Sequence, residues 1–294
     1  MLELRNVVHS YPGANRAALQ GIDLQLQAGE CLGLLGSNGA GKTTLLSLLS
    51  GVLALQQGEL RWEGQPRLGL VPQQLAFYAG LKVGENLELF ADLYRLHGAE
   101  RRQRLQQCID ICALDDKLTR RSEQLSGGEQ RRLNFAIGLL QPADVYLFDE
   151  ATVGVDAASR QHLLAAVEQL TAEGKAVIYT SHYLEEVERV AQRILLLHEG
   201  QVRLDLDKRQ LLGDDHGLLL EWPDAAPAGL HQLLASLQLT TEVLPKGLRI
   251  ASLNGQQLLA ITEFVAAQDG LPNLLRFGRP SLEQLYLRLN GGRL

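Results

Sequence analysis

The sequence predicts an α/β protein with a buried parallel sheet, followed by a second, smaller α+β domain. Two observations predict the main sheet: short β-rich apolar runs recur along the chain, and longer helical patterns separate them. A change of character near Asp205 predicts the second domain. The chain has 294 residues, of which 46% are hydrophobic, and this is enough to fill a sizeable core.

Four apolar runs are predicted as buried strands because turn or polar residues bound each of them: Gly29–Gly36, Arg67–Gln73, Ala143–Glu150 and Lys175–His182. Their nearly continuous apolar character is typical of a parallel sheet that is covered on both faces. The segments between them are predicted helices: Thr43–Leu49, Val83–Leu114, Arg131–Leu140 and Ser159–Ala172.

Three further segments predict a small antiparallel layer beside the main sheet. LELRNVVHSY and AALQGIDLQLQ, near the start of the chain, alternate as antiparallel strands do. ILLLHEGQVRL contains a hairpin-type turn at Glu199-Gly200.

The last part of the chain, from Gly217, shows the element order of a split βαβ unit. It comprises a strand (GLLLEW), a helix (AGLHQLLASL), two strands around Pro245-Lys246-Gly247, a helix (QQLLAITEFVAAQDG), a strand and a last helix. We therefore place one domain at residues 1–212 and an accessory domain at 213–294.

Composition excludes several classes of protein. The formal net charge of -6 argues against a nucleic-acid partner, which would require a basic face. Cys31, Cys108 and Cys112 are too few for a disulfide framework, and we expect reduced, intracellular thiols. The N-terminus lacks the pattern of a signal peptide, and the longest apolar run, Leu45–Leu55, is too short and too interrupted for a membrane helix. We expect that the chain itself does not cross a membrane.

The motif GSNGAGKT fits the phosphate-loop pattern and lies between a predicted strand and a predicted helix. Glycines allow backbone N–H groups to surround phosphate oxygens, Lys42 places a positive charge near the β and γ phosphates, and Thr43 offers a hydroxyl to Mg²⁺. A chance match is the alternative, and the structural context argues against it. The residues expected to bind the nucleotide here are Gly36, Ser37, Asn38, Gly39, Ala40, Gly41, Lys42, Thr43 and Thr44.

VYLFDE ends a predicted strand with two acidic residues. Asp149 can hold Mg²⁺ through water, and Glu150 can accept the proton of an attacking water. Two solvated carboxylates at a loop start are the alternative. We favour the functional interpretation because open α/β sheets bind ligands at the carboxyl ends of their strands.

LSGGEQRR, residues 125–132, forms a second helix start with free backbone N–H groups, which is a second anion site. With this motif the sequence resembles the ATP-binding cassette (ABC) ATPases: LSGGEQ matches that family's signature and lies between GSNGAGKT and VYLFDE, as in the family. The resemblance covers Leu2 to about Leu212. It implies a P-loop NTPase core with an antiparallel β subdomain, a helical subdomain at about residues 83–141, and binding of ATP and Mg²⁺.

Four weaker features agree with the resemblance. Tyr11 resembles the aromatic residue on which adenine stacks, Gln73 the glutamine that contacts Mg²⁺ and the coupling surface, Asp156 the aspartate of the inter-subunit loop, and His182 the switch histidine that reaches the γ-phosphate. Singly, each has another explanation. Tyr11 could be an ordinary aromatic residue at a strand end, and Gln73 a polar loop residue. Asp156 could be a helix N-cap, and His182 another cap or a histidine with satisfied hydrogen bonds. Their shared order and spacing favour the functional interpretation.

The resemblance also implies roles for these residues in a dimer. Two cassettes face each other head to tail, so the signature of one chain meets the γ-phosphate bound by its partner; the signature residues are Ser126, Gly127, Gly128, Glu129 and Gln130. The implied catalytic residues are Glu150, His182 and Gln73, and the implied Mg²⁺ ligands are Thr43, Gln73 and Asp149. The family's usual DEPT and GLDP occur here as DEAT and GVDA, and these departures affect loop rigidity rather than reacting groups.

The family resemblance implies that this chain is one subunit of a larger assembly. We expect integral membrane permease subunits to dock between the Gln73 loop and the segment Val83–Leu114, which would place the chain in the cytoplasm, peripheral on the cytoplasmic face of the cell membrane. The tail RPSLEQLYLRLNGG resembles the C-terminal tail found in the exporter branch of the family, which includes drug-resistance and polysaccharide or lipid export ATPases. The alternatives are an importer subunit, a soluble ABC ATPase acting on ribosomes or DNA, and an inactive regulatory cassette. The sequence leaves open whether the dimer is a homodimer or a heterodimer.

Overall fold

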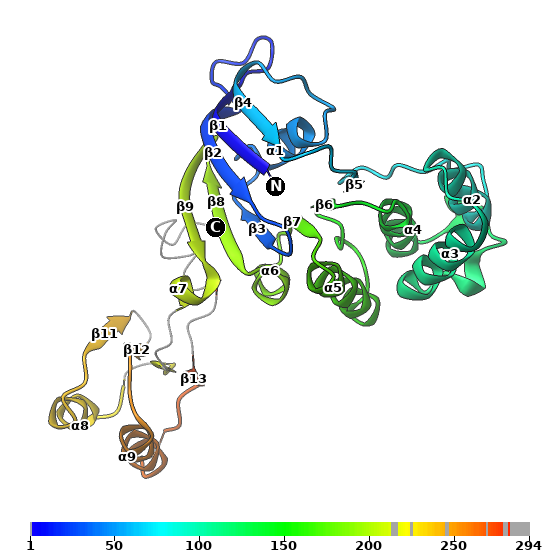
Figure 1. Ribbon diagram of the computed structural model, residues 1–294. Helices are drawn as coiled ribbons and strands as arrows, with labels where there is room; N and C mark the ends of the chain where they lie inside the picture. The colour runs from blue at the N-terminus through cyan, green and yellow to red at the C-terminus, as the bar shows by residue number, and fades with distance from the viewer. Residues whose placement is uncertain are drawn as a thin grey trace. The chain divides into compact units, whose positions relative to one another are not determined.

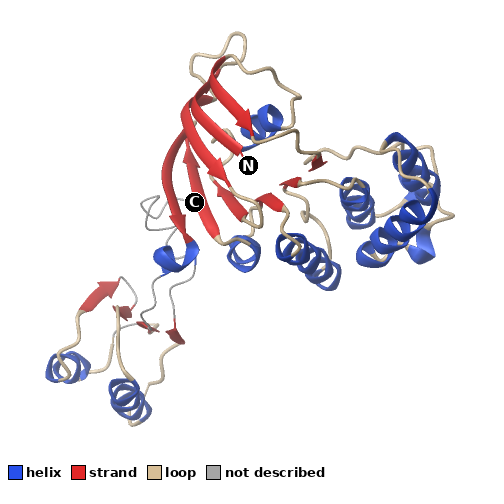
Figure 2. Cartoon of the chain, in the orientation of Figure 1, coloured by secondary structure: helices blue, strands red, loops and turns tan. Residues whose placement is uncertain are grey.

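A computed structural model of the chain describes residues 2–212, 217–223, 226–244, 247–268, 270–278 and 282. The chain forms two compact units, Met1–Lys208 and Arg209–Leu294. Figure 1 labels the helices and strands, and Figure 2 distinguishes them by colour. None of the helices in the described ranges has both the length and the apolar character needed to cross a bilayer.

The first unit is built on a six-stranded sheet with the order β5-β6-β7-β3-β8-β9. Its strands are β3 (Cys31–Leu35), β5 (Leu68–Val71), β6 (Val145–Asp149), β7 (Ala176–Thr180), β8 (Arg193–His198) and β9 (Gln201–Asp207). All neighbouring strands are parallel except β8 and β9. Every residue of β3, β6 and β7 is buried, which confirms the predicted parallel sheet covered on both faces.

Helices cover this sheet on both faces. Figure 1 shows α4 (Gly127–Leu140), α5 (Ala157–Ala172) and α6 (Leu184–Val190) along one face, with α1 (Lys42–Leu49) on the other. A short helix, α7 (Lys208–Leu212), follows β9.

An antiparallel sheet with the order β2-β1-β4 lies beside α1. It consists of β1 (Leu2–His9), β2 (Leu19–Leu26) and β4 (Gln57–Trp62). The first two strands were expected from their alternation. The sequence analysis missed β4, because its residues are partly or fully exposed and their pattern carries no apolar run.

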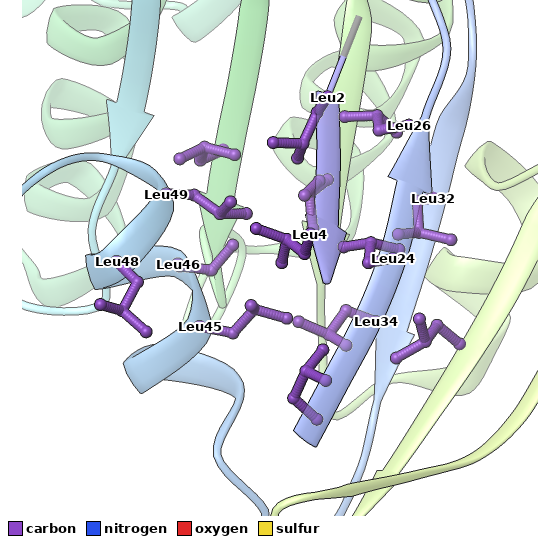
Figure 3. Packing of buried hydrophobic residues seen from close by; sticks show 14 of the residues in the cluster. Leu2, Leu4, Leu24, Leu26, Leu32, Leu34, Leu45, Leu46, Leu48 and Leu49 are labelled. Atoms are coloured by element: carbon purple, nitrogen blue, oxygen red, sulfur yellow. The ribbon is translucent and has the colours of Figure 1, made fainter. Parts of the chain in front are cut away.

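One hydrophobic core joins the two sheets through α1 (Figure 3). The leucines labelled in Figure 3 come from α1, β1, β2 and β3: Leu45, Leu46, Leu48 and Leu49 of α1, Leu2 and Leu4 of β1, Leu24 and Leu26 of β2, and Leu32 and Leu34 of β3. Burial of each such side chain contributes roughly 1.5–3 kcal/mol relative to exposure. Because α1 is packed from both sides, the loop that immediately precedes it has a fixed support.

The predicted helix Val83–Leu114 is wrong as a single element, because the chain forms two helices, α2 (Val83–Leu93) and α3 (Gly98–Cys112). Arg95 and Gly98 both have a φ of +57°, which no helix interior can hold. The N–H of Leu96 bonds back to the carbonyl of Ala91, closing the end of α2. Short 3₁₀ helices at Asp115–Lys117 and Ser122–Gln124 then lead to α4.

Two other predicted elements differ in place. The hairpin around Glu199-Gly200 does form, yet it belongs to the main sheet rather than to the antiparallel layer, because β8 pairs in parallel with β3. The helix predicted from Arg131 begins four residues earlier, at Gly127, because the Ser126 side chain caps it.

The second unit contains an antiparallel sheet with the order β11-β12-β10-β13. Its elements are β10 (Gly217–Glu221), α8 (Leu230–Ser236), β11 (Thr241–Leu244), β12 (Gly247–Ile250), α9 (Gly255–Ala266) and β13 (Leu274–Gly278). β12 separates β10 from β11, which confirms the split βαβ arrangement. The predicted last helix, in the tail RPSLEQLYLRLNGG, lies outside the described residues apart from Leu282.

Candidate functional site

The predicted phosphate loop connects β3 to α1 and lines a pocket of about 870 Å³. Gly41 has a φ of +107°, and a Cβ atom there would lie 2.6 Å from the carbonyl oxygen of Ala18. Only glycine fits this position. Ser37 through Thr44 all line the pocket, whereas Gly36 supports it from behind, with Leu197 O 2.5 Å from the place of a Cβ.

Lys42 lies within this loop and is only 6% exposed. Its Nζ donates to the carbonyl oxygens of Gly36 at 2.8 Å and Ser37 at 3.3 Å. Burial lowers the pKa of the Lys42 ammonium, while the negative charges of Glu150 and Asp149 act in the opposite direction. A partly desolvated cation in a loop of N–H groups is suited to bind phosphate oxygens.

The carboxyl end of β6 turns Glu150 out of the strand toward the pocket. Its backbone has a φ of +51°, a left-handed conformation that is unfavourable for glutamate. The N–H of Glu150 donates to the Thr180 carbonyl at 3.2 Å and to Thr180 Oγ1 at 3.0 Å. Thr180 Oγ1 in turn donates to Asp149 Oδ1 at 3.0 Å, so one residue of β7 orients both acids.

Glu150 contacts the two other side chains predicted to be catalytic. Gln73 Nε2 donates to Glu150 Oε2 at 2.8 Å, and His182 Nε2 lies 2.7 Å from Glu150 Oε1. The three residues follow β5, β6 and β7, which are adjacent in the sheet. The structure therefore brings Gln73, Glu150 and His182 together in one wall of the pocket.

Helix α4 holds the loop that carries Gln73. Asn134, which is 1% exposed, donates to the Pro72 carbonyl at 3.0 Å and accepts the Ala76 N–H at 2.8 Å. Arg131 Nη1 donates to the carbonyl of Gln73 itself at 2.5 Å. The loop is thus bonded at both ends and in the middle to the helix that begins at Ser126.

Tyr11 lines the same pocket from the end of β1, is 43% exposed and shares a 3.2 Å hydrogen bond with Thr44 Oγ1. An exposed ring in this place can stack on a base. Three polar lining residues were not predicted from the sequence: Arg16, His198 and Glu199. The hairpin turn holds them there, because Gly200 N–H donates to the Ala40 carbonyl at 3.0 Å; the Glu199-Gly200 turn signal was visible in the sequence, but its contact with the phosphate loop was not.

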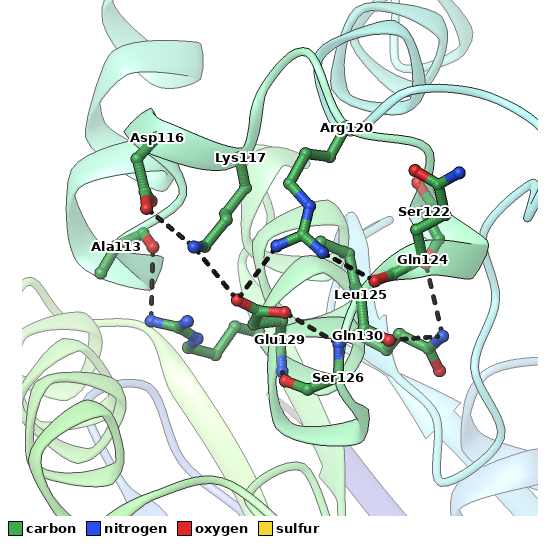
Figure 4. Close-up of polar contacts among 11 residues, drawn as sticks. Ala113, Asp116, Lys117, Arg120, Ser122, Gln124, Leu125, Ser126, Glu129 and Gln130 are labelled. Carbon is green, nitrogen blue, oxygen red and sulfur yellow. Dashed lines mark hydrogen bonds and ion pairs between the residues drawn. The ribbon is translucent and has the colours of Figure 1, made fainter.

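The signature residues form a closed polar cluster at the start of α4 (Figure 4). Ser126 Oγ accepts the Glu129 N–H at 3.3 Å, and Glu129 Oε2 accepts the Ser126 N–H at 2.8 Å. Lys117 and Arg120 lie 3.3 and 3.8 Å from Glu129 Oε1. The hydrogen bond from the Ser126 backbone lowers the pKa of the Glu129 carboxyl. Ser126 and Glu129 thus form a reciprocal capping box at this helix start.

The structure does not bring this signature to the chain's own phosphate loop. None of the residues Ser126–Gln130 lines the pocket at the phosphate loop. Gly128 instead packs against the loop before α5: a Cβ at Gly128 would lie 2.8 Å from the carbonyl oxygen of Gly154. The signature and the Gly154 loop therefore touch through backbone atoms.

Asp156 caps α5, as the structural alternative for this residue predicted. Its Oδ1 accepts the Ser159 N–H at 2.9 Å. This hydrogen bond lowers the pKa of the Asp156 carboxyl. The cap leaves the second carboxylate oxygen available to another molecule, so a cap and an inter-subunit contact are compatible.

Comparison with known proteins shows similarity to ATP-binding proteins of ABC transporters. A model of the ABC transporter family matches residues 19–153. The linearmycin resistance ATP-binding protein LnrL of Bacillus subtilis is 32% identical over 99% of this chain and 98% of its own length. The Nod factor export ATP-binding protein I of Paraburkholderia xenovorans is 32% identical over 99% of this chain and 97% of its own.

Solved structures agree with these relatives. An ATP-binding subunit of an ABC transporter shares the fold, with a TM-score of 0.67 and 24% identity over 72% of this chain and 91% of that one. A dimeric ATP-binding cassette in a post-hydrolysis state, bound to ADP and phosphate, has a TM-score of 0.66 and 26% identity over 71% of this chain and 99% of that one.

Replacing Asp156 separates its two roles. Asp156→Ser keeps a capping oxygen and should retain the melting temperature, whereas Asp156→Ala should lower it at neutral pH. The cap is complete at neutral pH, because the lowered pKa means that it is lost only as the pH falls through that value. If the carboxylate also makes an inter-subunit contact, both variants should lose about 10- to 100-fold in ATP turnover, as for one charge-assisted hydrogen bond. Full turnover in Asp156→Ser would leave the residue as a cap alone.

Proposed function

The chain belongs to the ABC transporter family of ATP-binding subunits, and we propose on that basis that it powers export of a substrate through separate membrane subunits. Alignment over nearly the whole chain with ATP-binding proteins named for linearmycin resistance and Nod factor export carries this proposal. Full-length relatives with these names favour export over an importer, a soluble ribosome or DNA factor, and a regulatory cassette. The reaction is hydrolysis of ATP to ADP and phosphate.

The wall formed by Gln73, Glu150 and His182 supports a specific division of labour. Glu150 is the general base: its carboxylate is oriented by two side chains and lies in the pocket that the phosphate loop lines. His182 is proposed to transfer its hydrogen bond from Glu150 to the γ-phosphate once ATP is bound. Lys42 binds the β and γ phosphates, and Tyr11 stacks on the adenine.

The donor set fits Mg²⁺, which usually binds through one or two carboxylates together with substrate phosphates. Thr43 supplies a hydroxyl, Asp149 a carboxylate and Gln73 the amide oxygen that remains when its Nε2 donates to Glu150. Within the described residues, no group of three or more His, Cys, Asp or Glu side chains could hold a metal. Phosphate oxygens of the nucleotide would complete the proposed Mg²⁺ site. Bound Mg²⁺ would neutralise charge on the phosphates.

We propose that two cassettes assemble head to tail; a similar ATP-binding cassette of known structure is dimeric. The supporting observation is that Ser126 and Gly128 lie at a capped helix start outside the chain's own pocket, and the first N–H groups of a helix have no partner within the helix. A second nucleotide-binding chain supplies the phosphate for this helix start.

The permease is proposed to dock in an apolar groove beside the Gln73 loop. The groove measures about 260 Å³, and its apolar lining comes from both the sheet and the helical segment: Val52, Leu68, Leu70, Pro72, Ala76, Phe90, Tyr94 and Ile137. Val52 is 70% exposed, and Leu93 and Tyr78, on and before α2, are 59% and 56% exposed. An amphipathic helix of a membrane subunit would cover these side chains, which would place the chain on the cytoplasmic face of the membrane.

The domain organisation completes the proposal. We propose a nucleotide-binding domain at residues 1–212, with a helical subdomain at about 83–141, and an accessory domain at 213–294. The second unit has its own core, which includes Leu218, Leu220, Leu230 and Ile261, and this supports its treatment as a domain.

Glu150→Gln tests the catalytic assignment. The amide keeps the shape and the contact with Gln73 but cannot accept a proton, so turnover should fall about 100- to 10,000-fold while ATP binding is retained. Dimers should then accumulate on gel filtration with ATP and Mg²⁺. Normal turnover in this variant would remove Glu150 from the role of base.

Mixing two inactive variants tests the head-to-tail assembly. Lys42→Ala removes the charge of the phosphate loop, and Ser126→Arg blocks the signature helix start, so each homodimer should fail to occlude nucleotide. A mixed dimer carries one site with both changes and one with neither, and about half of the dimers should be mixed if exchange is equal. ATP-dependent occlusion should therefore return on mixing. Occlusion no greater than in either variant alone, with mixed dimers demonstrated, would contradict a site shared between chains.

A charge in the groove tests the permease proposal. Val52→Glu should abolish copurification of a membrane protein from solubilised membranes, because it places a charge against an apolar helix, while ATP binding is retained. Val243→Glu is the matched control, since Val243 is 72% exposed in the second unit, and copurification should persist. Docking in the groove would be contradicted if the membrane protein copurified equally with the unaltered chain, Val52→Glu and Val243→Glu. Sedimentation of the unaltered chain with ribosomes instead would also contradict it.

A further inference from the structure

A buried carboxylate, Glu186 on α6, lies outside the nucleotide pocket, and its side chain is 4% exposed. Its Oε2 accepts hydrogen bonds from Ser181 Oγ at 2.6 Å, Thr152 Oγ1 at 2.7 Å and Tyr179 Oη at 2.9 Å. Burial raises the pKa of the Tyr179 hydroxyl well above its usual value, with the charge of Glu186 adding to the effect, so this group stays a donor. All three hydroxyls donate to this one carboxylate oxygen, which accepts a hydrogen bond from each of them.

Two of these donors come from the loops that carry the proposed catalytic groups. Thr152 lies two residues after Glu150, and Ser181 immediately precedes His182. Ser181 Oγ also accepts the N–H of Tyr183 at 3.0 Å, so the backbone is held on both sides of His182. The third donor, Tyr179, lies within strand β7 rather than in a loop, and its Oη also shares a 3.3 Å hydrogen bond with Thr152 Oγ1.

The other oxygen of Glu186 connects to the inter-subunit loop. Arg160 Nε of α5 forms an ion pair with Glu186 Oε1 at 3.2 Å. Arg160 Nη2 donates to the carbonyl of Val155 at 3.0 Å, directly before Asp156. The same guanidinium lies 4.5 Å above the ring centre of Tyr183, the residue after His182.

We propose that Glu186 is a positioning residue for ATP hydrolysis: it fixes the Glu150 loop, the His182 loop and the Asp156 loop relative to one another. Contact of a partner chain at Asp156 would then act on Glu150 and His182 through Arg160 and Glu186. This inference rests on the catalytic roles proposed above. Its energetic basis is that the three hydrogen bonds to this buried carboxylate resist displacement, whereas a shift of about 1 Å in a reacting group can cost about 100-fold in rate.

Ser181→Ala and Tyr179→Phe form a matched pair that tests the proposal in the full chain. Each removes one hydroxyl donor from the same carboxylate oxygen, yet only Ser181 belongs to a catalytic loop. We expect Ser181→Ala to lower the kcat of ATP hydrolysis about 10-fold with a KM for ATP within about twofold of the unaltered chain. Tyr179→Phe should keep kcat within about twofold while lowering the melting temperature.

Glu186→Gln and Glu185→Gln provide a second matched pair with the same loss of charge on the same helix. Glu185 is exposed, and its variant should keep kcat, whereas Glu186→Gln should lower kcat at unchanged KM. If Glu186→Gln does not fold, the comparison of Ser181→Ala with Tyr179→Phe still tests the positioning role of Glu186.

Two outcomes would overturn the inference. Equal losses of kcat in Ser181→Ala and Tyr179→Phe, in step with their melting temperatures, would assign Glu186 to stability alone. A raised KM with unchanged kcat would place it in nucleotide binding. Glu150→Gln measured in parallel keeps the two proposals apart, because retained turnover there would contradict the catalytic assignment itself.

Discussion

The carboxyl ends of β5, β6 and β7 lie side by side at one edge of the main sheet, and the arrangement of the candidate active site depends on this constraint. Parallel neighbours end together, so the residues that follow each strand reach one place although they are up to 109 positions apart in the chain, from Gln73 to His182. Glu150 lies in the middle and is bonded on either side. The left-handed backbone of this residue is tolerated because Thr180, at the end of the neighbouring strand, binds its N–H.

Helix α4 connects that edge to the surface proposed for a second chain. Its first turn presents the signature, and its next turns hold the Gln73 loop through Arg131 and Asn134. One helix therefore holds the loop of Gln73, which contacts the proposed base Glu150, and borders the groove proposed for the permease through Asn134 and Ile137. The same helix carries the proposed trans site at its start. Movement of the groove wall would move the signature as well. Helix α4 could therefore couple transport to hydrolysis, because it contacts both the groove and the Gln73 loop.

The chemistry-bearing motifs were predictable from the sequence because each is local: a loop of glycines before Lys42, two acids at a strand end, a capped helix at Ser126. The family resemblance supplied the distant partners, Gln73 and His182. What the sequence could not supply were contacts set by tertiary packing. The break at Arg95 depends on a left-handed residue, β4 has almost no apolar pattern, and the approach of Glu199 to the phosphate loop depends on how the hairpin joins β3. The role proposed for Glu186 could not be predicted for the same reason, because the sequence does not show whether a glutamate is buried or exposed.

The contact between Gly128 and Gly154 has a mechanical consequence. Side chains that separate two loops can change rotamer and absorb a displacement, but here the two main chains touch with no side chain between them. A shift of the signature is therefore passed to the neighbouring loop at nearly full amplitude. The signature and the Gly154 loop would therefore move together. A facing molecule that contacts one of them would contact the other in a fixed relative position.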